Sequence, residues 1–335
     1  MKFTICYLAT QGQDVLVDMD SFKLGSRFAN KIWNATRYLL MNLEGRNLVK
    51  IDPSKFNAVD KWIYHSLNEN VLKVRTAIEG YKFNEAAQAA YDFFWNDFCD
   101  WYVEASKLSL YTGDDAEKDR VVSILMDLLA ESMKMMHPML SFITEEIWSK
   151  LPNTENKVIN ASFPEYSDDR KYPAEAKLML AMQDLVRGIR NMRAELGIGA
   201  EKKLRIVVRT DEAGELSAFM KDHIGLLKVF ANSDDLQIDD CAKLDIAGAF
   251  PVAGSGFESY VFVRDAIDIE KEIGRLEADI AKTQALLDVV EKKLSNEKFI
   301  ANAKPEAIEK EKGKKAEFVE KIDKSRKHIE VLRSF

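Results

Sequence analysis

The stretch AIDIEKEIGRLEADIAKTQALLDVVEKKL, residues 266–294, has the most regular hydrophobic pattern in the chain. Its apolar side chains recur every three or four residues, which is the spacing of a coiled-coil seam. One heptad position holds Ala266, Ile273, Ile280, Leu287 and Leu294, and the other holds Ile269, Leu276, Thr283 and Val290. The stretch therefore predicts a long helix that packs against a second helix.

The second helix follows in the sequence itself. The repeat stops over residues 295–304, and Pro305 suits the first position of a new helix. Two heptad positions are then filled less regularly, one by Ile308, Ile322 and Ile329 and the other by Phe318 and Leu332. Glu311, Lys315 and Ser325 interrupt this seam, so we expect the hairpin to be weakest near its tip. Two helices of about 30 residues make an arm about 40–45 Å long.

The first 150 or so residues show the longer period of amphipathic helices. Phe28, Ile32, Ala35 and Leu39 lie at positions i, i+4, i+7 and i+11, which predicts one buried stripe. Comparable stripes occupy residues 62–78, 87–108 and 117–136, and a further helix is predicted over 139–150. These patterns predict an antiparallel helical bundle.

After a loop-like stretch, residues 152–173, the sequence changes character. One helix is predicted over 174–196, and the alternation that starts at Leu204 is typical of a strand with one buried face. A further helix is predicted over 216–231, and short strands over 236–239, 244–250 and 259–264. The fold class is therefore mainly α: a helical bundle (1–170), a small α/β module (171–264) and a coiled-coil arm (265–335).

Composition and motifs exclude several classes of function. The net charge of −7 excludes a uniformly basic nucleic-acid binder, and the arm is neutral, with 16 Lys/Arg and 16 Asp/Glu from residue 265 onward. No apolar run is long enough for a membrane span, and three distant cysteines favour a reducing cytoplasmic setting. The four histidines lack metal-ligand spacing, and no nucleotide-binding or nucleophile motif occurs. We expect no catalytic, cofactor-binding or metal site within these residues.

Three groups of residues are candidates for RNA contact, and each has an alternative interpretation as an ordinary solvated surface. The first, Arg27, Lys31, Asn34 and Tyr38, lies beside the buried stripe of one helix and combines cations with an aromatic ring. The second, Arg187, Arg190 and Arg193, spreads over an arc of about 120° on another helix. The third, Lys292, Lys293, Lys298 and Phe299, lies near the predicted tip of the arm.

Six segments resemble successive segments of bacterial valyl-tRNA synthetases, in the same order. They are FTICYLATQGQD (3–14), FANKIWNATRY (28–38), FCDWYVEASKL (98–108), HPMLSFITEEIW (137–148), IRNMRAEL (189–196) and KLSNEKF (293–299). The resemblance implies the helical anticodon-binding domain of class I synthetases, followed by a linker module and a tRNA-binding coiled coil. The family's ATP-dependent catalytic domain and its editing domain would lie upstream, because their signature motifs are absent here. We therefore expect part of a larger, monomeric, cytoplasmic enzyme.

The resemblance also implies roles for particular residues. Lys31 matches a lysine of the family's anticodon-facing helix, and Tyr38 stands where the family has an aromatic residue. Asp20 departs from the pattern, because some relatives have a basic residue there. The implied partner is valine tRNA, bound at its anticodon by the bundle and at its outer corner by the arm. Two alternatives remain at this point: the corresponding part of an isoleucyl or leucyl enzyme, and a coiled-coil scaffold for protein interactions.

Overall fold

The computed structural model describes the chain apart from residues 11–13, 16, 153, 155, 211–213, 239–247, 264–268, 297–304 and 334–335. It divides into two compact units, Met1–Met179 and Leu180–Phe335. The sequence predicts three domains, with a first boundary at residue 170, and this division stays a prediction. The second, at 264–265, coincides with residues outside the described part.

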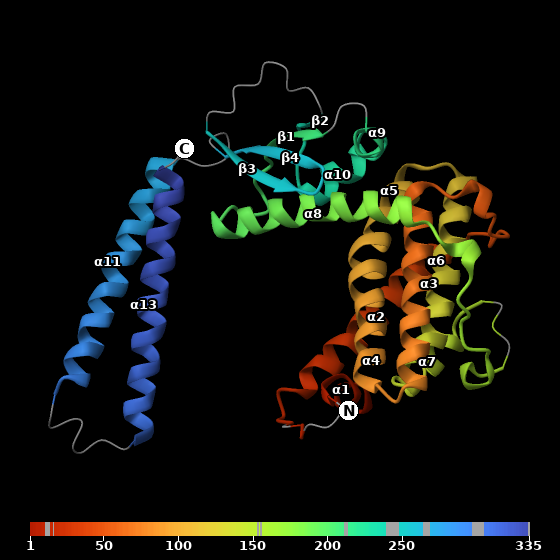
Figure 1. Ribbon diagram of the computed structural model, residues 1–335, viewed down its shortest axis with the longest axis horizontal. Helices are drawn as coiled ribbons and strands as arrows, with labels where there is room; N and C mark the ends of the chain where they lie inside the picture. Colours follow the sequence, from red (N-terminus) through yellow and green to blue (C-terminus); the bar gives the residue numbers. More distant parts are fainter. Residues whose placement is uncertain are drawn as a thin grey trace. The chain divides into compact units, whose positions relative to one another are not determined.

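The first unit is a bundle of helices, as predicted (Figure 1). They are α1 (Lys2–Leu8), α2 (Phe22–Leu43), α3 (Ala58–Glu79), α4 (Phe83–Asp92), η2 (Phe93–Val103), α5 (Glu104–Thr112), α6 (Asp115–Met136) and α7 (Ser141–Trp148), with the short turns η1 (Pro53–Lys55), η3 (Val158–Asn160) and η4 (Asp168–Arg170). The stripe of α2 is buried at Phe28, Ile32 and Leu39. Its Phe28 ring lies 4.9 Å from the Phe3 ring of α1, so the helices share one aromatic core.

The segment predicted as one regular helix over 87–108 has a different geometry. It begins as α4 and ends as α5, but the eleven residues between them, Phe93–Val103, form the π-helix η2. A π-helix has i to i+5 hydrogen bonds and is wider than an α-helix, so its side chains point in directions that an α-helical pattern does not predict.

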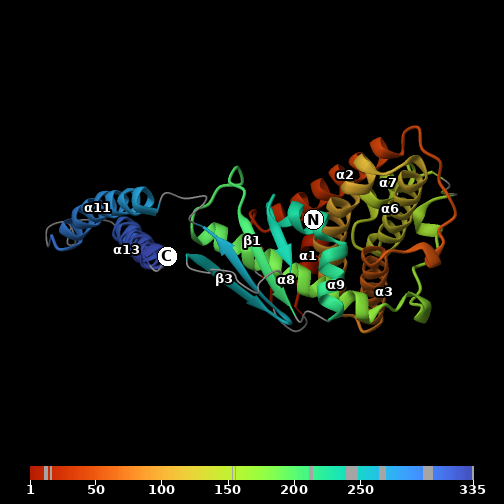
Figure 2. The same cartoon turned by 90° about the horizontal axis from the view of Figure 1, so that it is seen from above.

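A long helix, α8 (Pro173–Glu195), contains the boundary between the units. The second unit then has β1 (Arg205–Thr210), α9 (Glu215–Asp222), α10 (Ile224–Ala231), β2 (Leu236–Ile238), β3 (Ala249–Gly254) and β4 (Phe257–Phe262). The strand order is β2-β1-β4-β3; β1 is parallel to β2 and antiparallel to β4, and β3 is antiparallel to β4. Figure 2 shows this sheet from above.

Two details of the module differ from the sequence prediction. The helix predicted over 216–231 is two helices, which meet at His223. The strand predicted over 244–250 is β3, which starts at Ala249; residues 244–247 lie outside the described part. Its register is set by the turn that joins it to β4, where Gly256 has a φ of +83° that favours glycine.

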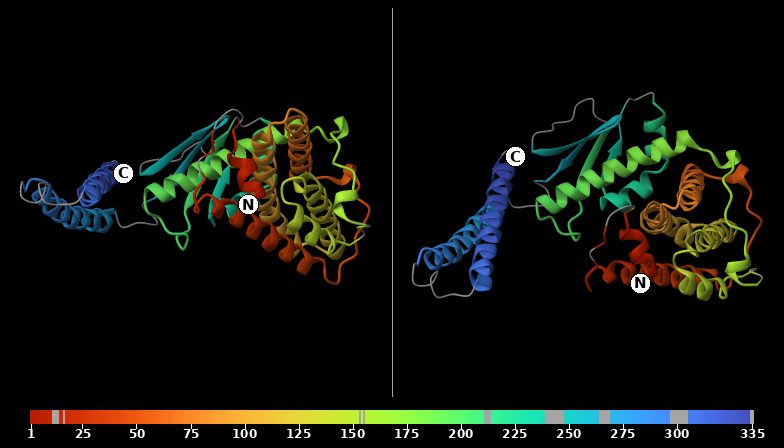
Figure 3. Two further views of the ribbon diagram at one scale, coloured as in Figure 1. Left: turned by 90° about the horizontal axis from the view of Figure 1, so that it is seen from below. Right: turned by 60° about the horizontal axis from the view of Figure 1, so that its bottom comes forward.

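The arm consists of α11 (Ile269–Leu294) and α13 (Pro305–Arg333), which lie side by side along their lengths (Figures 1 and 3). The predicted seam is confirmed at its buried side chains: Leu276, Thr283, Leu287, Val290, Ile322, Ile329 and Leu332. Near the tip, Glu311 is also buried in the seam, 2.7 Å from Lys314. Two ion pairs join the helices there, Glu291–Lys315 at 2.9 Å and Lys293–Glu311 at 3.8 Å.

Leu287→Ala should lower the stability of the arm by about 2–5 kcal/mol, because it leaves a cavity in a seam that α11 and α13 share. The measurement is thermal unfolding of the full chain, followed by far-UV circular dichroism. The neighbouring Leu286 is 54% exposed, so Leu286→Ala is a matched control that should change little. Equal losses of stability in the two variants would contradict the packing of Leu287 between α11 and α13.

Candidate nucleic-acid interface

The residues that the sequence singled out on α2 form one stripe, but they differ in exposure. Arg27 and Asn34 are exposed, whereas Lys31 and Tyr38 are half-buried. The half-buried pair is oriented toward η2 and α5, since its contacts come from those elements. The α2 stripe therefore forms a surface together with residues of η2 and α5.

Lys31 is held by two side chains of the π-helix. Its Nζ lies 2.5 Å from Asp100 Oδ1 and 5.2 Å from the centroid of the Trp95 ring. The Lys31 side chain is 30% exposed and that of Asp100 44%, so the pair lies at the surface. Neither partner was predicted, because both lie far from Lys31 in the sequence, Asp100 by 69 positions.

Tyr38 contacts α5. Lys107 Nζ lies 5.5 Å from the centroid of the Tyr38 ring, and Glu104 pairs with the same ammonium group at 2.7 Å. Burial, and then the neighbouring Tyr111 hydroxyl, raise the pKa of Tyr38, so this phenol stays protonated at neutral pH. Tyr111 is itself 68% exposed. Sequence reasoning missed Lys107 and Tyr111, although their four-residue spacing on one helix face was a usable signal.

These residues make up a surface that we call the α2–α5 face. It comprises Arg27, Lys31, Asn34 and Tyr38 of α2, Trp95 and Asp100 of η2, and Glu104, Lys107 and Tyr111 of α5. It offers three exposed or half-exposed aromatic rings, several cations and two carboxylates. Such a combination suits unpaired nucleobases, which stack on aromatic rings and exchange hydrogen bonds with charged and amide groups.

The three arginines of α8 do not form one open basic strip. Arg187 pairs with Asp184 at 2.7 Å, and Arg190 donates to the Phe230 carbonyl at 3.3 Å; both side chains remain exposed. Arg193 is 7% exposed, and its Nη2 donates to the carbonyls of Gly199 and Lys202 at 2.6 and 2.5 Å. Arg193 thus stabilises the turn that follows α8, so its role is structural and its side chain is not available at the surface.

Part of the predicted tip cluster is described. Lys292 and Lys293 are exposed on the last turn of α11, and Lys293 pairs across the arm with Glu311. Lys298 and Phe299 lie outside the described residues. The end of α11 therefore presents positive charge, favourably placed because the C-terminus of a helix carries partial negative charge.

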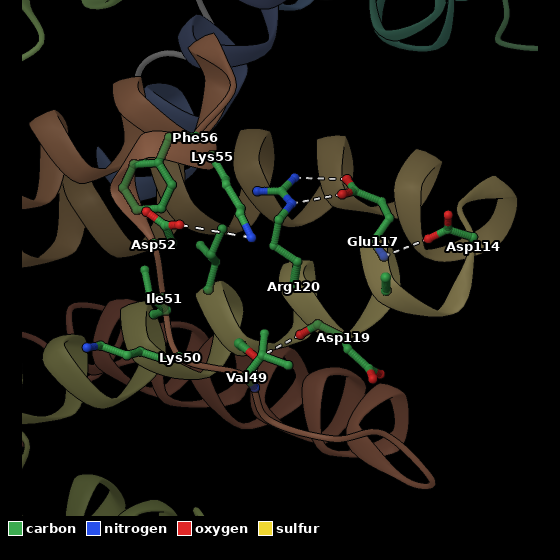
Figure 4. A pocket seen from close by; sticks show the side chains of 13 residues that line it. Val49, Lys50, Ile51, Asp52, Lys55, Phe56, Asp114, Glu117, Asp119 and Arg120 are labelled. Atoms are coloured by element: carbon green, nitrogen blue, oxygen red, sulfur yellow. Dashed lines mark hydrogen bonds and ion pairs between the residues drawn. The ribbon is translucent and has the colours of Figure 1, made fainter.

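Figure 4 shows a separate cavity of about 550 Å³ in the first unit. It lies between residues 49–56 and the first turns of α6. The charged groups that line it are largely paired with one another: Arg120 contacts both carboxylate oxygens of Glu117 at 2.8 Å and reaches Asp60 at 2.6 Å. Asp114 caps α6 by accepting from the Glu117 amide at 2.8 Å. These contacts show that the charged residues around the cavity stabilise the fold.

The described residues were examined for clusters of metal-ligating side chains and for membrane-spanning helices. No group of three histidine, cysteine, aspartate or glutamate side chains in that part of the chain is placed to hold a metal ion. No helix among the described residues is long and apolar enough to cross a membrane.

Arg120→Met should lower the free energy of unfolding by about 3–5 kcal/mol, because Asp60 is buried and would lose its countercharge. Chemical denaturation of the full chain measures this effect. Lys150→Met is the control: it removes the exposed pair with Glu146 (2.8 Å), which is worth no more than about 1 kcal/mol. Similar effects of both substitutions would argue against the buried network.

Comparison with known proteins finds two known domains in the chain. The anticodon-binding domain of tRNA ligase matches residues 60–208, and the valyl tRNA synthetase tRNA binding arm matches residues 268–333. Both are domains of enzymes that attach amino acids to tRNA, so the chain is a tRNA-binding part of a tRNA ligase.

The similar proteins indicate which kind of tRNA ligase the chain belongs to. The chain is 41% identical to the valine–tRNA ligase of Treponema denticola, 39% to that of Treponema pallidum and 36% to that of Thermotoga maritima. These alignments cover 99%, 95% and 100% of this chain but only 38%, 36% and 36% of the relatives. The chain belongs to the valyl-tRNA synthetase family, and it spans little more than a third of the length of these relatives.

Proposed function

We propose that the α2–α5 face recognises the anticodon of valine tRNA, and that the arm supports the outer corner of the same tRNA. The observation that carries the proposal is the grouping of cations over aromatic rings where α2 meets η2 and α5. Of these three helices, η2 and α5 lie within residues 60–208, which match the anticodon-binding domain. In the complete enzyme, binding at these two places would hold the tRNA for ATP-dependent attachment of valine. That reaction requires a catalytic site, which we expect to belong to the part of the relatives that this chain does not cover.

The groups on the α2–α5 face match the chemistry of unpaired bases. Tyr38 and Tyr111 offer rings for stacking, and Glu104 offers an acceptor for an exocyclic amino group. Lys31 and Asn34 offer donors for base or phosphate oxygens. A base in this position would be read by its hydrogen-bonding edge as well as by stacking, which is what discrimination between anticodons requires.

The charge distribution of the chain favours recognition of particular RNA groups over a general attraction to phosphates. The chain is negative overall and its arm is neutral, so contacts with phosphate depend on local groups such as Lys292. Two such modest sites on one chain reinforce each other, because binding at the first raises the effective concentration at the second. The monomeric state and the cytoplasmic location remain predictions.

Tyr38→Ala should weaken binding of valine tRNA by about tenfold, since removal of a stacking ring costs about 1–3 kcal/mol. Electrophoretic mobility shifts at low salt, with valine tRNA and with a version changed at the middle anticodon base, measure this effect. Tyr81→Ala is the control, because Tyr81 is a 76% exposed tyrosine of the same unit. If the unaltered chain does not prefer the natural anticodon, anticodon recognition by this face is refuted.

Replacing Lys292 and Lys293 by glutamine should weaken tRNA binding and make it less sensitive to salt. The slope of log K against log salt should fall by about one for each phosphate that the arm no longer neutralises. A salt titration of tRNA binding measures that slope. Lys55 and Lys82 are exposed lysines of the bundle, and their double replacement by glutamine is the control. An unchanged slope in the arm variant would remove these residues from the interface.

A further inference from the structure

We infer that Asp100 and Trp95 are positioning residues for Lys31: they fix its ammonium group so that it reads the RNA by a directed hydrogen bond. The inference rests on the proposed function, because it concerns how the α2–α5 face discriminates between anticodons. It assigns a role to the π-helix, which the comparisons leave without one.

The geometry of η2 creates this arrangement. Trp95 and Asp100 are five residues apart, and in an α-helix residues at that spacing diverge by about 140°. The i to i+5 hydrogen bonds of a π-helix bring such residues back to the same side. Both side chains consequently meet one ammonium group, with Asp100 Oδ1 at 2.5 Å and the Trp95 ring at 5.2 Å. An α-helical η2 could present only one of these two side chains to Lys31.

The two contacts restrict Lys31 without using all its donors. An ammonium has three N–H groups, and the ion pair takes one, while the indole face attracts the charge without accepting a conventional hydrogen bond. Lys31 keeps 30% of its side-chain surface exposed. A lysine held in this way avoids most of the rotamer entropy that a free side chain loses on binding, and it presents the remaining N–H groups in fixed directions.

Asp100 also changes what the lysine recognises. The negative charge of Asp100 offsets the positive charge of Lys31. The pair as a whole therefore attracts distant phosphates only weakly. A short-range hydrogen bond to a correctly placed acceptor remains available. The pair therefore contributes to selectivity more than to general affinity for RNA, as directed base contacts do in comparison with phosphate contacts.

A positioning role of Asp100 predicts a different effect on tRNA binding from a purely structural role. Asp100→Asn should leave Lys31 with the Trp95 ring alone, so its ammonium group keeps its charge but loses the ion pair that fixes its direction. Binding of tRNA with a changed middle anticodon base should then stay the same or become tighter, while binding of valine tRNA weakens. The ratio of the two affinities should fall about threefold to tenfold, which corresponds to the removal of one well-placed hydrogen bond.

A double-mutant cycle in the full chain tests the inference. The variants are Lys31→Met, Asp100→Asn and the two combined, each titrated with both tRNAs, with melting temperature as the measure of folding. We expect each single variant to lower the affinity ratio, and the double variant to match Lys31→Met, because Asp100 acts through Lys31. Asp100→Glu should restore part of the ratio. Glu85→Gln, which breaks the exposed Lys82–Glu85 pair (3.0 Å), is the control.

The outcomes separate this inference from the proposed function. If Asp100→Asn leaves the ratio unchanged while Lys31→Met lowers it, the positioning role is refuted and the α2–α5 face stands. If Asp100→Asn lowers the ratio equally with and without Lys31, Asp100 acts independently and the inference is again refuted. If the unaltered chain has no preference between the two tRNAs, the proposed function itself fails.

Discussion

One buried carboxylate holds the bundle in the arrangement on which the rest depends. Asp60 of α3 accepts hydrogen bonds from Tyr102 of η2 and Arg120 of α6, both at 2.6 Å, and from the Asn57 amide at its own helix start at 3.1 Å. Only 3% of its surface is exposed, so its charge must be compensated by these partners. Because Tyr102 belongs to the π-helix, this contact also fixes the orientation of the side chains that η2 presents to α2.

Under the proposed function, the arm and the bundle would bind a large, charged ligand in two different ways, with a chain of negative net charge. The bundle gathers aromatic rings and partly neutralised cations on a rigid face, which suits short-range recognition of bases. The arm extends two helices whose charges balance, so its contribution depends on shape and on a few local lysines. The proposed function therefore gives selective base contacts to the bundle and extended contact with the RNA to the arm.

The sequence predicted those features that follow from a regular period. The heptads of α11 and the stripe of α2 were sufficient to locate the seam and the core, since each repeat corresponds to one standard helix geometry. The π-helix was not predictable in this way, because the pattern around Phe98 was compatible with an ordinary α-helix. The partners of Lys31 and the internal role of Arg193 were also missed, since both depend on contacts between segments that periodicity does not relate.

The polar residue in the seam of the arm has a consequence for its local stability. Glu311 lies toward the tip, whereas Ile322, Ile329 and Leu332 fill the seam toward the other end. Backbone amides should therefore exchange with solvent fastest near Glu311 and progressively more slowly along α13, with no need for the bundle to unfold. An arm with such a gradient can adjust its outer end to the curvature of a ligand at little cost, while its base keeps a fixed helix pairing.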